Sequence, residues 1–136
     1  MLSSKRRGVS AIDPDSGSAG GSILVVEDDH DTRVLMRATL EDAGFEVHTA
    51  ANGRDALLLL RRMTTLPRLM LVDLRMPVMD GWQFLSELHG DARLKPIPVG
   101  VQTASLETTL PDGVSFVLPK PVDVAALLVF ARHHCR

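Results

Sequence analysis

An apolar run that ends in a single acid constrains this chain more than any other feature. Residues 69–72 are LMLV, and Asp73 follows directly, before a proline-bearing turn and a second turn at Asp80-Gly81. A short, uninterrupted apolar run is typical of a strand that is buried on both faces of a sheet. Because open α/β sheets bind their ligands beyond the carboxyl ends of the strands, we expect Asp73 to lie at a binding edge.

Similar short apolar segments alternate with helical patterns along the chain. We expect strands at residues 23–26, 45–49, 69–73, 97–103 and 114–118, and helices at residues 31–43, from Gly53 to about Met63, at residues 82–89 and from about Asp123 to His133. Residues 105–113 contain a proline and a glycine, so that the fourth helix is predicted to be short or degenerate. This alternation predicts a parallel sheet covered by helices on both faces. At this length we expect an α/β, flavodoxin-like, doubly wound sheet of five parallel strands in the order 2-1-3-4-5.

Composition restricts the domain organisation and the classes of partner. The 136 residues are 45% hydrophobic, which is enough for one domain with its own core. Residues 1–21 are dominated by Ser, Gly, Ala and Asp and are predicted to be a disordered tail, whereas residues 22–136 are predicted to be the folded domain. The net charge of -2 provides no electrostatic basis for binding nucleic acid or an anionic membrane. Without a secretory signal or an apolar stretch of ~20 residues, we expect a cytoplasmic protein.

Polar residues follow four of the expected strands. Glu27 and Asp28 follow the first, Asp73 ends the third, Thr103 ends the fourth and Lys120 follows the fifth. In the expected order the first and third strands are neighbours, which would bring three carboxylates into one crevice. Such charges repel unless a hard divalent cation is bound, and Mg²⁺ accepts carboxylates and substrate oxygens together. A carboxylate can attack phosphorus to form an aspartyl phosphate, so Asp73 is the predicted nucleophile, with Lys120 and Thr103 contacting the phosphoryl oxygens.

Each of these groups alone has a simpler interpretation. Acids after a strand often cap the next helix, and a single threonine or lysine at a strand end is usually solvated surface. Their joint occurrence, in order, at the ends of four strands is what indicates a site.

The stretches that carry these residues resemble the response-regulator receiver domain of two-component signalling. They are ILVVEDD, LMLVDLRMPVMDG, the strand ending in TA, and LPKPVD, and with the segments between them they extend from residue 23 to about residue 132. The resemblance implies that Asp73 accepts a phosphoryl group from a histidine kinase or phosphotransfer protein, rather than turning over a substrate as an enzyme. It also implies Mg²⁺ bound by Asp28, Asp73 and the backbone carbonyl of Arg75, with Glu27 acting through a water.

The same resemblance implies roles for the two later strand ends. Lys120 pairs with the phosphoryl group, and Thr103 forms a hydrogen bond with it and moves on activation. The Lys120-Pro121 peptide is typically cis in such domains, which proline makes accessible at a cost of only ~0.5–1 kcal/mol.

The chain departs from the family pattern in three places. An aromatic residue usually lies three positions before the lysine, where this chain has Val117, with Phe116 one place earlier. A shift of one residue along a strand turns the side chain to the opposite face, so either the aromatic switch is missing or the strand contains a bulge. The segment between the fourth and fifth strands is also shorter than usual. Arg75 and Ser105 occupy positions that tune dephosphorylation, where a guanidinium either holds a phosphoryl oxygen or is simply solvated.

The last helix has more apolar residues than one buried face needs. One side carries Val124, Leu127, Leu128 and Ala131, and a second carries Ala126, Val129 and Phe130. A helix on the outside of a sheet should be apolar on one side. Either a dimer partner, kinase or downstream protein contacts the face formed by the fifth strand and this helix, or the helix is simply rich in apolar residues and contacts no partner. In contrast, the expected inward stripe of the first helix is ordinary and consists of Leu35, Met36, Leu40 and Ala43.

Two other functions are compatible with part of the pattern. A receiver-like docking or dimerisation module would keep the fold without phosphorylation, and Val117 and the short segment before the fifth strand favour it. A Mg²⁺-dependent phosphatase of the haloacid-dehalogenase type would also form an aspartyl phosphate, but it needs a general acid two residues after the nucleophile. Arg75 occupies that position, which argues against turnover.

Overall fold

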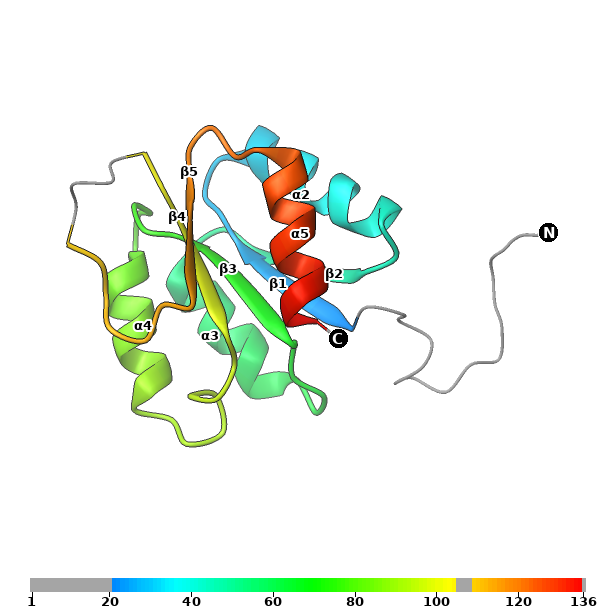
Figure 1. Cartoon of the computed structure of the whole chain (residues 1–136). Helices are drawn as coiled ribbons and strands as arrows, with labels where there is room; N and C mark the ends of the chain where they lie inside the picture. The colour runs from blue at the N-terminus through cyan, green and yellow to red at the C-terminus, as the bar shows by residue number, and fades with distance from the viewer. Residues whose placement is uncertain (1–20, 105–108, 136) are drawn as a thin grey trace.

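The computed structural model describes residues 21–104 and 109–135 of the chain. Its strands are β1 (Ser22–Val26), β2 (Glu46–Ala50), β3 (Leu69–Asp73), β4 (Val99–Thr103) and β5 (Phe116–Pro119), and its helices are α2 (His30–Asp42), α3 (Gly53–Arg62), α4 (Gly81–His89) and α5 (Val124–His134). All paired strands are parallel, and the sheet order β2-β1-β3-β4-β5 confirms the predicted α/β topology (Figure 1). Among the described residues, no helix is both long enough and apolar enough to cross a bilayer.

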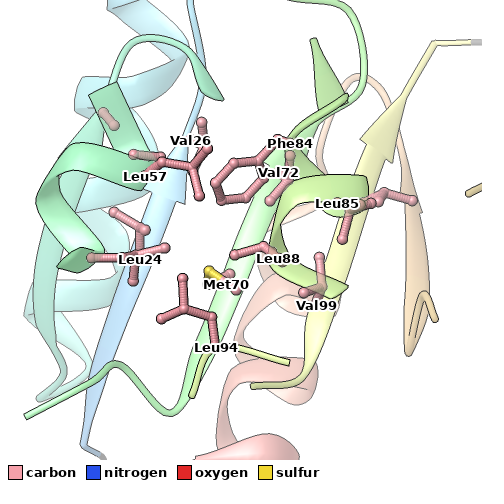
Figure 2. Packing of buried hydrophobic residues seen from close by; sticks show 14 of the residues in the cluster. Leu24, Val26, Leu57, Met70, Val72, Phe84, Leu85, Leu88, Leu94 and Val99 are labelled. Atoms are coloured by element: carbon pink, nitrogen blue, oxygen red, sulfur yellow. The ribbon is translucent and has the colours of Figure 1, made fainter. Parts of the chain in front are cut away.

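The sheet is the middle of three layers, with α3 and α4 on one face and α2 and α5 on the other (Figure 1). Successive side chains of a strand point to opposite faces, so each strand contributes to both layers. In β1, Leu24 and Val26 pack with α3 and α4, whereas Ile23 and Val25 pack with α2 and α5. Figure 2 shows the first of these cores, where Phe84 from α4 lies beside Val72 from β3. Strands buried on both faces explain the uninterrupted apolar runs in the sequence.

Helix starts are set by short polar side chains. Asp29, Asn52, Asp80 and Asp123 are the N-caps of the four described helices, and each accepts a hydrogen bond from a backbone N–H in the first turn. α4 begins at Gly81, one residue before the predicted start, because Asp80 and the residue three positions later form a full capping box.

Two predicted helix faces differ in detail from the structure. Met36 and Leu40 of α2 are buried as expected, but the expectation for Leu35 was wrong, since its side chain is 58% exposed. The two buried residues of α2 lie one helical turn apart and form a narrow stripe toward the sheet, and Leu35 lies outside this stripe. On α5, Leu127 and Ala131 are buried as expected, but Ala126 and Phe130 of the predicted second side also pack against this core, and Val129, which is 62% exposed, is the residue of that side that faces outward.

The phenylalanine of β5 faces α5, and the strand contains no bulge. The register Gly100↔Phe116, Val101↔Val117 continues without interruption to the end of β5. Phe116 stacks on Phe130 with ring centroids 4.3 Å apart. Val117 packs against the core on the α3 and α4 side. Of the two alternatives left open by the sequence, the missing aromatic at position 117 is therefore correct.

Two predictions fall wholly or partly outside the described residues. The predicted disordered tail lies there except for Gly21. Of the segment between β4 and β5, Ala104 and residues 109–115 contain no helix, and residues 105–108 are outside the described ranges. The short or degenerate fourth helix therefore stays a prediction.

The contact between Gly100 and the Phe116 ring predicts a destabilising substitution. A Cβ atom on Gly100 would lie 2.2 Å from two atoms of that ring, and such overpacking typically costs about 1–3 kcal/mol. We expect Gly100→Ala to lower the urea midpoint of unfolding, and Phe116→Leu in the same background to recover part of the loss.

Gly90→Ala is the matched control. A Cβ at Gly90 would have its nearest neighbour at 3.6 Å, and its φ of -82 suits an L-residue. Equal midpoints for the Gly100 and Gly90 variants would contradict the packing described for β5.

Candidate functional site

Three acids meet at the carboxyl edge of the sheet, where β1 and β3 lie side by side. Glu27 and Asp28 follow β1, and Asp73 is the last residue of β3. One carboxylate oxygen from each lies within 4.8 Å of the others. Glu27 is 0% and Asp73 only 4% exposed, whereas Asp28 faces solvent. Two of the three carboxylates are therefore buried, and the third is exposed beside them.

Asp29 has a different task from the two acids that precede it. Its side chain caps α2, accepting hydrogen bonds from Thr32 N at 2.9 Å and from Thr32 Oγ1 at 2.6 Å. These bonds lower the pKa of Asp29. Its own N–H donates to Glu27 Oε2 at 3.0 Å, which orients that carboxylate. The capping interpretation of the acidic run thus holds for Asp29 and leaves Glu27 and Asp28 for the site.

Both oxygens of Asp73 are held in place. The Arg75 N–H donates to Asp73 Oδ1 at 3.2 Å, and Lys120 Nζ donates to Asp73 Oδ2 at 2.9 Å. The segment that follows β3 forms a closed turn, because Gly81 N–H donates a hydrogen bond to the Leu74 carbonyl at 2.9 Å. The Asp73 side chain is therefore positioned by the local turn and by a lysine from β5.

Lys120 joins the fifth strand to the acids. Besides its bond to Asp73, its Nζ lies 3.1 Å from Glu27 Oε1. Burial acts to lower the pKa of Lys120, but the hydrogen bond and charge of Asp73, followed by the charge of Glu27, outweigh it and raise this pKa. The Lys120-Pro121 peptide is cis, as the resemblance implied. The site therefore contains a charged ammonium group.

One ammonium group does not neutralise three carboxylates. Glu27 is the carboxylate whose burial is least compensated. Burial, with the nearby charge of Asp73, raises the pKa of Glu27 from its usual 4.5 to about 7, against the opposing effects of the Asp29 N–H and Lys120. The contact from Lys120 to Glu27 Oε1 is an ion pair without hydrogen-bond geometry, so this buried oxygen has no hydrogen-bond partner among the described residues. A buried carboxylate oxygen without a hydrogen-bond partner, within an acidic triad, fits a hard divalent cation such as Mg²⁺ with its water ligands.

Thr103 lies at the same edge, at the end of β4, and is 4% exposed. It is opposite Pro119 in the register, and its carbonyl accepts a hydrogen bond from Lys120 N–H at 2.9 Å. The residues predicted from the four strand ends are thus gathered at one edge of the sheet.

Two features of this edge were not predicted from the sequence. Gln102 pairs with Asp73 in the register, is fully buried, and has neither amide atom hydrogen-bonded among the described residues. The one signal for it was a long polar side chain inside the apolar run of β4. The second feature is the Arg75 guanidinium, which lies over the Trp82 ring, 5.6 Å from its centroid. Arg75 and Trp82 line a pocket of about 330 Å³ together with Asp28.

A doubly wound sheet with three carboxylates and a lysine at its switch point defines the class of CheY-like domains. Residues 23–132 match the family model of the response regulator receiver domain, and the chain belongs to this family.

Two relatives show how the chain compares in sequence. It is 37% identical over 118 residues to an uncharacterized 14.6 kDa protein from Leptolyngbya boryana, covering 83% of this chain and 88% of that one. It is also 37% identical over 118 residues to the response regulator Rre1 of Synechocystis, covering 82% of this chain and 50% of Rre1. The chain thus spans nearly all of the first relative and half of the second.

Solved structures show the same fold. Chemotaxis response regulator CheY4 of Vibrio cholerae is 30% identical, with a TM-score of 0.73 over 83% of this chain and 97% of CheY4. The receiver domain of sensor histidine kinase PA1611 from Pseudomonas aeruginosa PAO1 is 27% identical, with a TM-score of 0.78 over 85% of this chain and 98% of that domain. That domain has a magnesium ion coordinated in its active-site cleft.

The raised pKa of Glu27 predicts a pH dependence of stability in metal-free protein. The folded state retains the Glu27 proton to about pH 7, whereas the unfolded state loses it near 4.5. The stabilisation from this proton is therefore complete below pH 4.5 and is lost as the pH rises through 7, by about 1–3 kcal/mol. Urea unfolding in EDTA from pH 5 to 8 measures it.

Glu27→Gln is the control for this slope. His134, whose pKa burial lowers, acts in the opposite direction in the same window but is common to both proteins. The stability difference between wild type and Glu27→Gln should therefore shift in favour of the variant as the pH rises. A difference that stays constant with pH would show that Glu27 titrates normally.

Proposed function

We propose that this chain is a response-regulator receiver that accepts a phosphoryl group on Asp73 from a phosphohistidine of a histidine kinase or phosphotransfer protein. It then signals through a conformational change. The observation that carries the proposal is the contact of one lysine with two buried carboxylates, Lys120 with Asp73 and Glu27, beside the exposed Asp28. Receiver domains as a family are phosphoacceptors that partner histidine kinases.

The chain's own residues prepare Asp73 for the transfer. An Asp73 oxygen forms a bond to phosphorus as the bond from phosphorus to the donor imidazole nitrogen breaks, and that nitrogen keeps the electron pair and takes a proton. Lys120 and the Arg75 N–H orient the attacking carboxylate. Asp28, Asp73 and the Arg75 backbone carbonyl would hold Mg²⁺, with Glu27 acting through a water, and the ion would neutralise charge on the transferred group.

After transfer the lysine and threonine respond to the new charge. Lys120 Nζ already lies 2.9 Å from Asp73 Oδ2, so a phosphoryl group on Asp73 is within its reach. The Thr103 hydroxyl supplies a donor at the same edge. A state in which both groups contact the phosphoryl oxygens is favoured over the resting state, and this differential contact is what shifts the equilibrium.

The structure supports a phosphoacceptor over a phosphatase. A phosphatase of this kind needs a proton donor two residues after its nucleophile, and Arg75 is there. A guanidinium does not release its proton in the working pH range, and the Arg75 side chain rests on an indole ring.

The domain limits and the partner surface are also part of the proposal. The folded unit covers residues 22–136 after a tail of residues 1–21, in keeping with the start of β1 at Ser22. A dimer partner or downstream protein would contact the β5 and α5 face, where Val124 and Val129 are 43% and 62% exposed.

Acetyl phosphate tests the phosphoacceptor directly. With Mg²⁺ present, the intact mass of the wild type should rise by one phosphoryl group, and this gain should vanish in Asp73→Asn. Asp31→Asn is the matched control, because Asp31 is an exposed acid in the first turn of α2 and outside the acidic triad.

Two other outcomes would sink the proposal in different ways. No mass gain, under conditions that modify a known receiver, would favour the docking module. Many turnovers of inorganic phosphate release without accumulation would favour a phosphatase.

A further inference from the structure

Arg75 and Trp82 connect the phosphoryl site with the chain that leads into β5. The Arg75 guanidinium carbon lies 5.6 Å from the centroid of the Trp82 ring, a distance typical of a cation–π contact. The indole Nε1–H of Trp82 donates to the Thr109 carbonyl at 2.9 Å. One face of the ring thus carries a cation, while its edge holds a backbone segment 27 residues further on.

The same arginine is tied to the acidic triad at its other end. Its backbone N–H donates to Asp73 Oδ1 at 3.2 Å. Its side chain shares the 330 Å³ pocket with Asp28 and Trp82. The guanidinium of Arg75 therefore has open space between the Trp82 ring and the acids. It can lie on the ring or turn toward a negative charge at the acidic triad.

The charge on Asp73 decides this competition. A phosphoryl group brings two negative charges and three strong acceptor oxygens, and a charge-assisted hydrogen bond to it is stronger than a cation–π contact at an exposed ring. A cation on the face of an indole also polarises its N–H toward a stronger donor. Loss of Arg75 from the ring should therefore weaken the bond from Trp82 to Thr109.

Neither position 117 nor Phe116 can take this role. Position 117 is a valine, and Phe116 is buried and stacked on Phe130 on the opposite side of the sheet. Trp82 is the single tryptophan of the sequence, and it stands in the first turn of α4.

We propose that Trp82 reads the charge of Asp73: on phosphorylation Arg75 leaves the indole for the phosphoryl group, and the hold of Trp82 on the Thr109 carbonyl is released. Trp82 is a positioning residue that passes the state of Asp73 to the chain ahead of β5. This inference depends on the proposed phosphorylation of Asp73 and adds the route by which the change leaves the site.

Intrinsic fluorescence tests this route, because all tryptophan emission comes from Trp82. Mg²⁺ with acetyl phosphate should shift the emission to the red and increase quenching by iodide, whereas Mg²⁺ alone should do neither. The phosphorylated fraction is measured by intact mass in the same samples, and the emission change is expressed per phosphorylated molecule. Arg75→Gln should lose this change, and Arg75→Lys should retain part of it.

Hydrogen exchange provides a second measurement. Hydrogen exchange of the backbone amides of residues 109–116 should become faster when the wild type is phosphorylated. In Trp82→Phe this exchange should be fast both before and after phosphorylation. A mass gain with unchanged emission, or an equal emission change in Arg75→Gln, would overturn the inference and leave the phosphoacceptor intact. Absence of the mass gain itself would overturn both.

Discussion

The ion pairs of Lys120 with two buried carboxylates are the interaction on which the rest of this site depends. A buried charge without compensation is strongly destabilising, and the ammonium that lies 2.9 Å from Asp73 and 3.1 Å from Glu27 offsets part of this cost. The three residues come from the ends of three different strands. Formation of the site therefore requires the sheet order that brings β1, β3 and β5 to one edge.

The negative charge that Lys120 leaves uncompensated at the edge of the sheet is the property on which the proposed function depends. One ammonium leaves the acidic triad with surplus negative charge. Burial, followed by the charge of Asp73, raises the pKa of Glu27, and its Oε1 has no hydrogen-bond partner among the described residues. In the proposed function a divalent cation would offset this surplus, and a phosphoryl group on Asp73 would add negative charge and shift the balance again. An edge with incomplete charge compensation is thus suited to a two-state response.

Local signals predicted the elements of this fold well. The β3 strand has the predicted limits, Leu69–Asp73, because an apolar run that meets an acid and then a turn offers few other structures. The meeting of Glu27, Asp28 and Asp73 followed from the order of the strands. What the sequence did not predict depends on contacts between distant segments: the exposure of Leu35, the direction of Phe116, and the contacts of Trp82 with residues on either side of it in the sequence.

Binding of Mg²⁺ tests the central claim that this edge carries uncompensated negative charge. An ion that binds only the folded state raises its stability with concentration, by about 2.7 kcal/mol at a hundred times the dissociation constant. We expect the thermal midpoint of the wild type to rise with the logarithm of the Mg²⁺ concentration across the millimolar range, and Asp28→Asn to lose most of this rise. A midpoint that does not respond to Mg²⁺, or responds equally in both proteins, would contradict it.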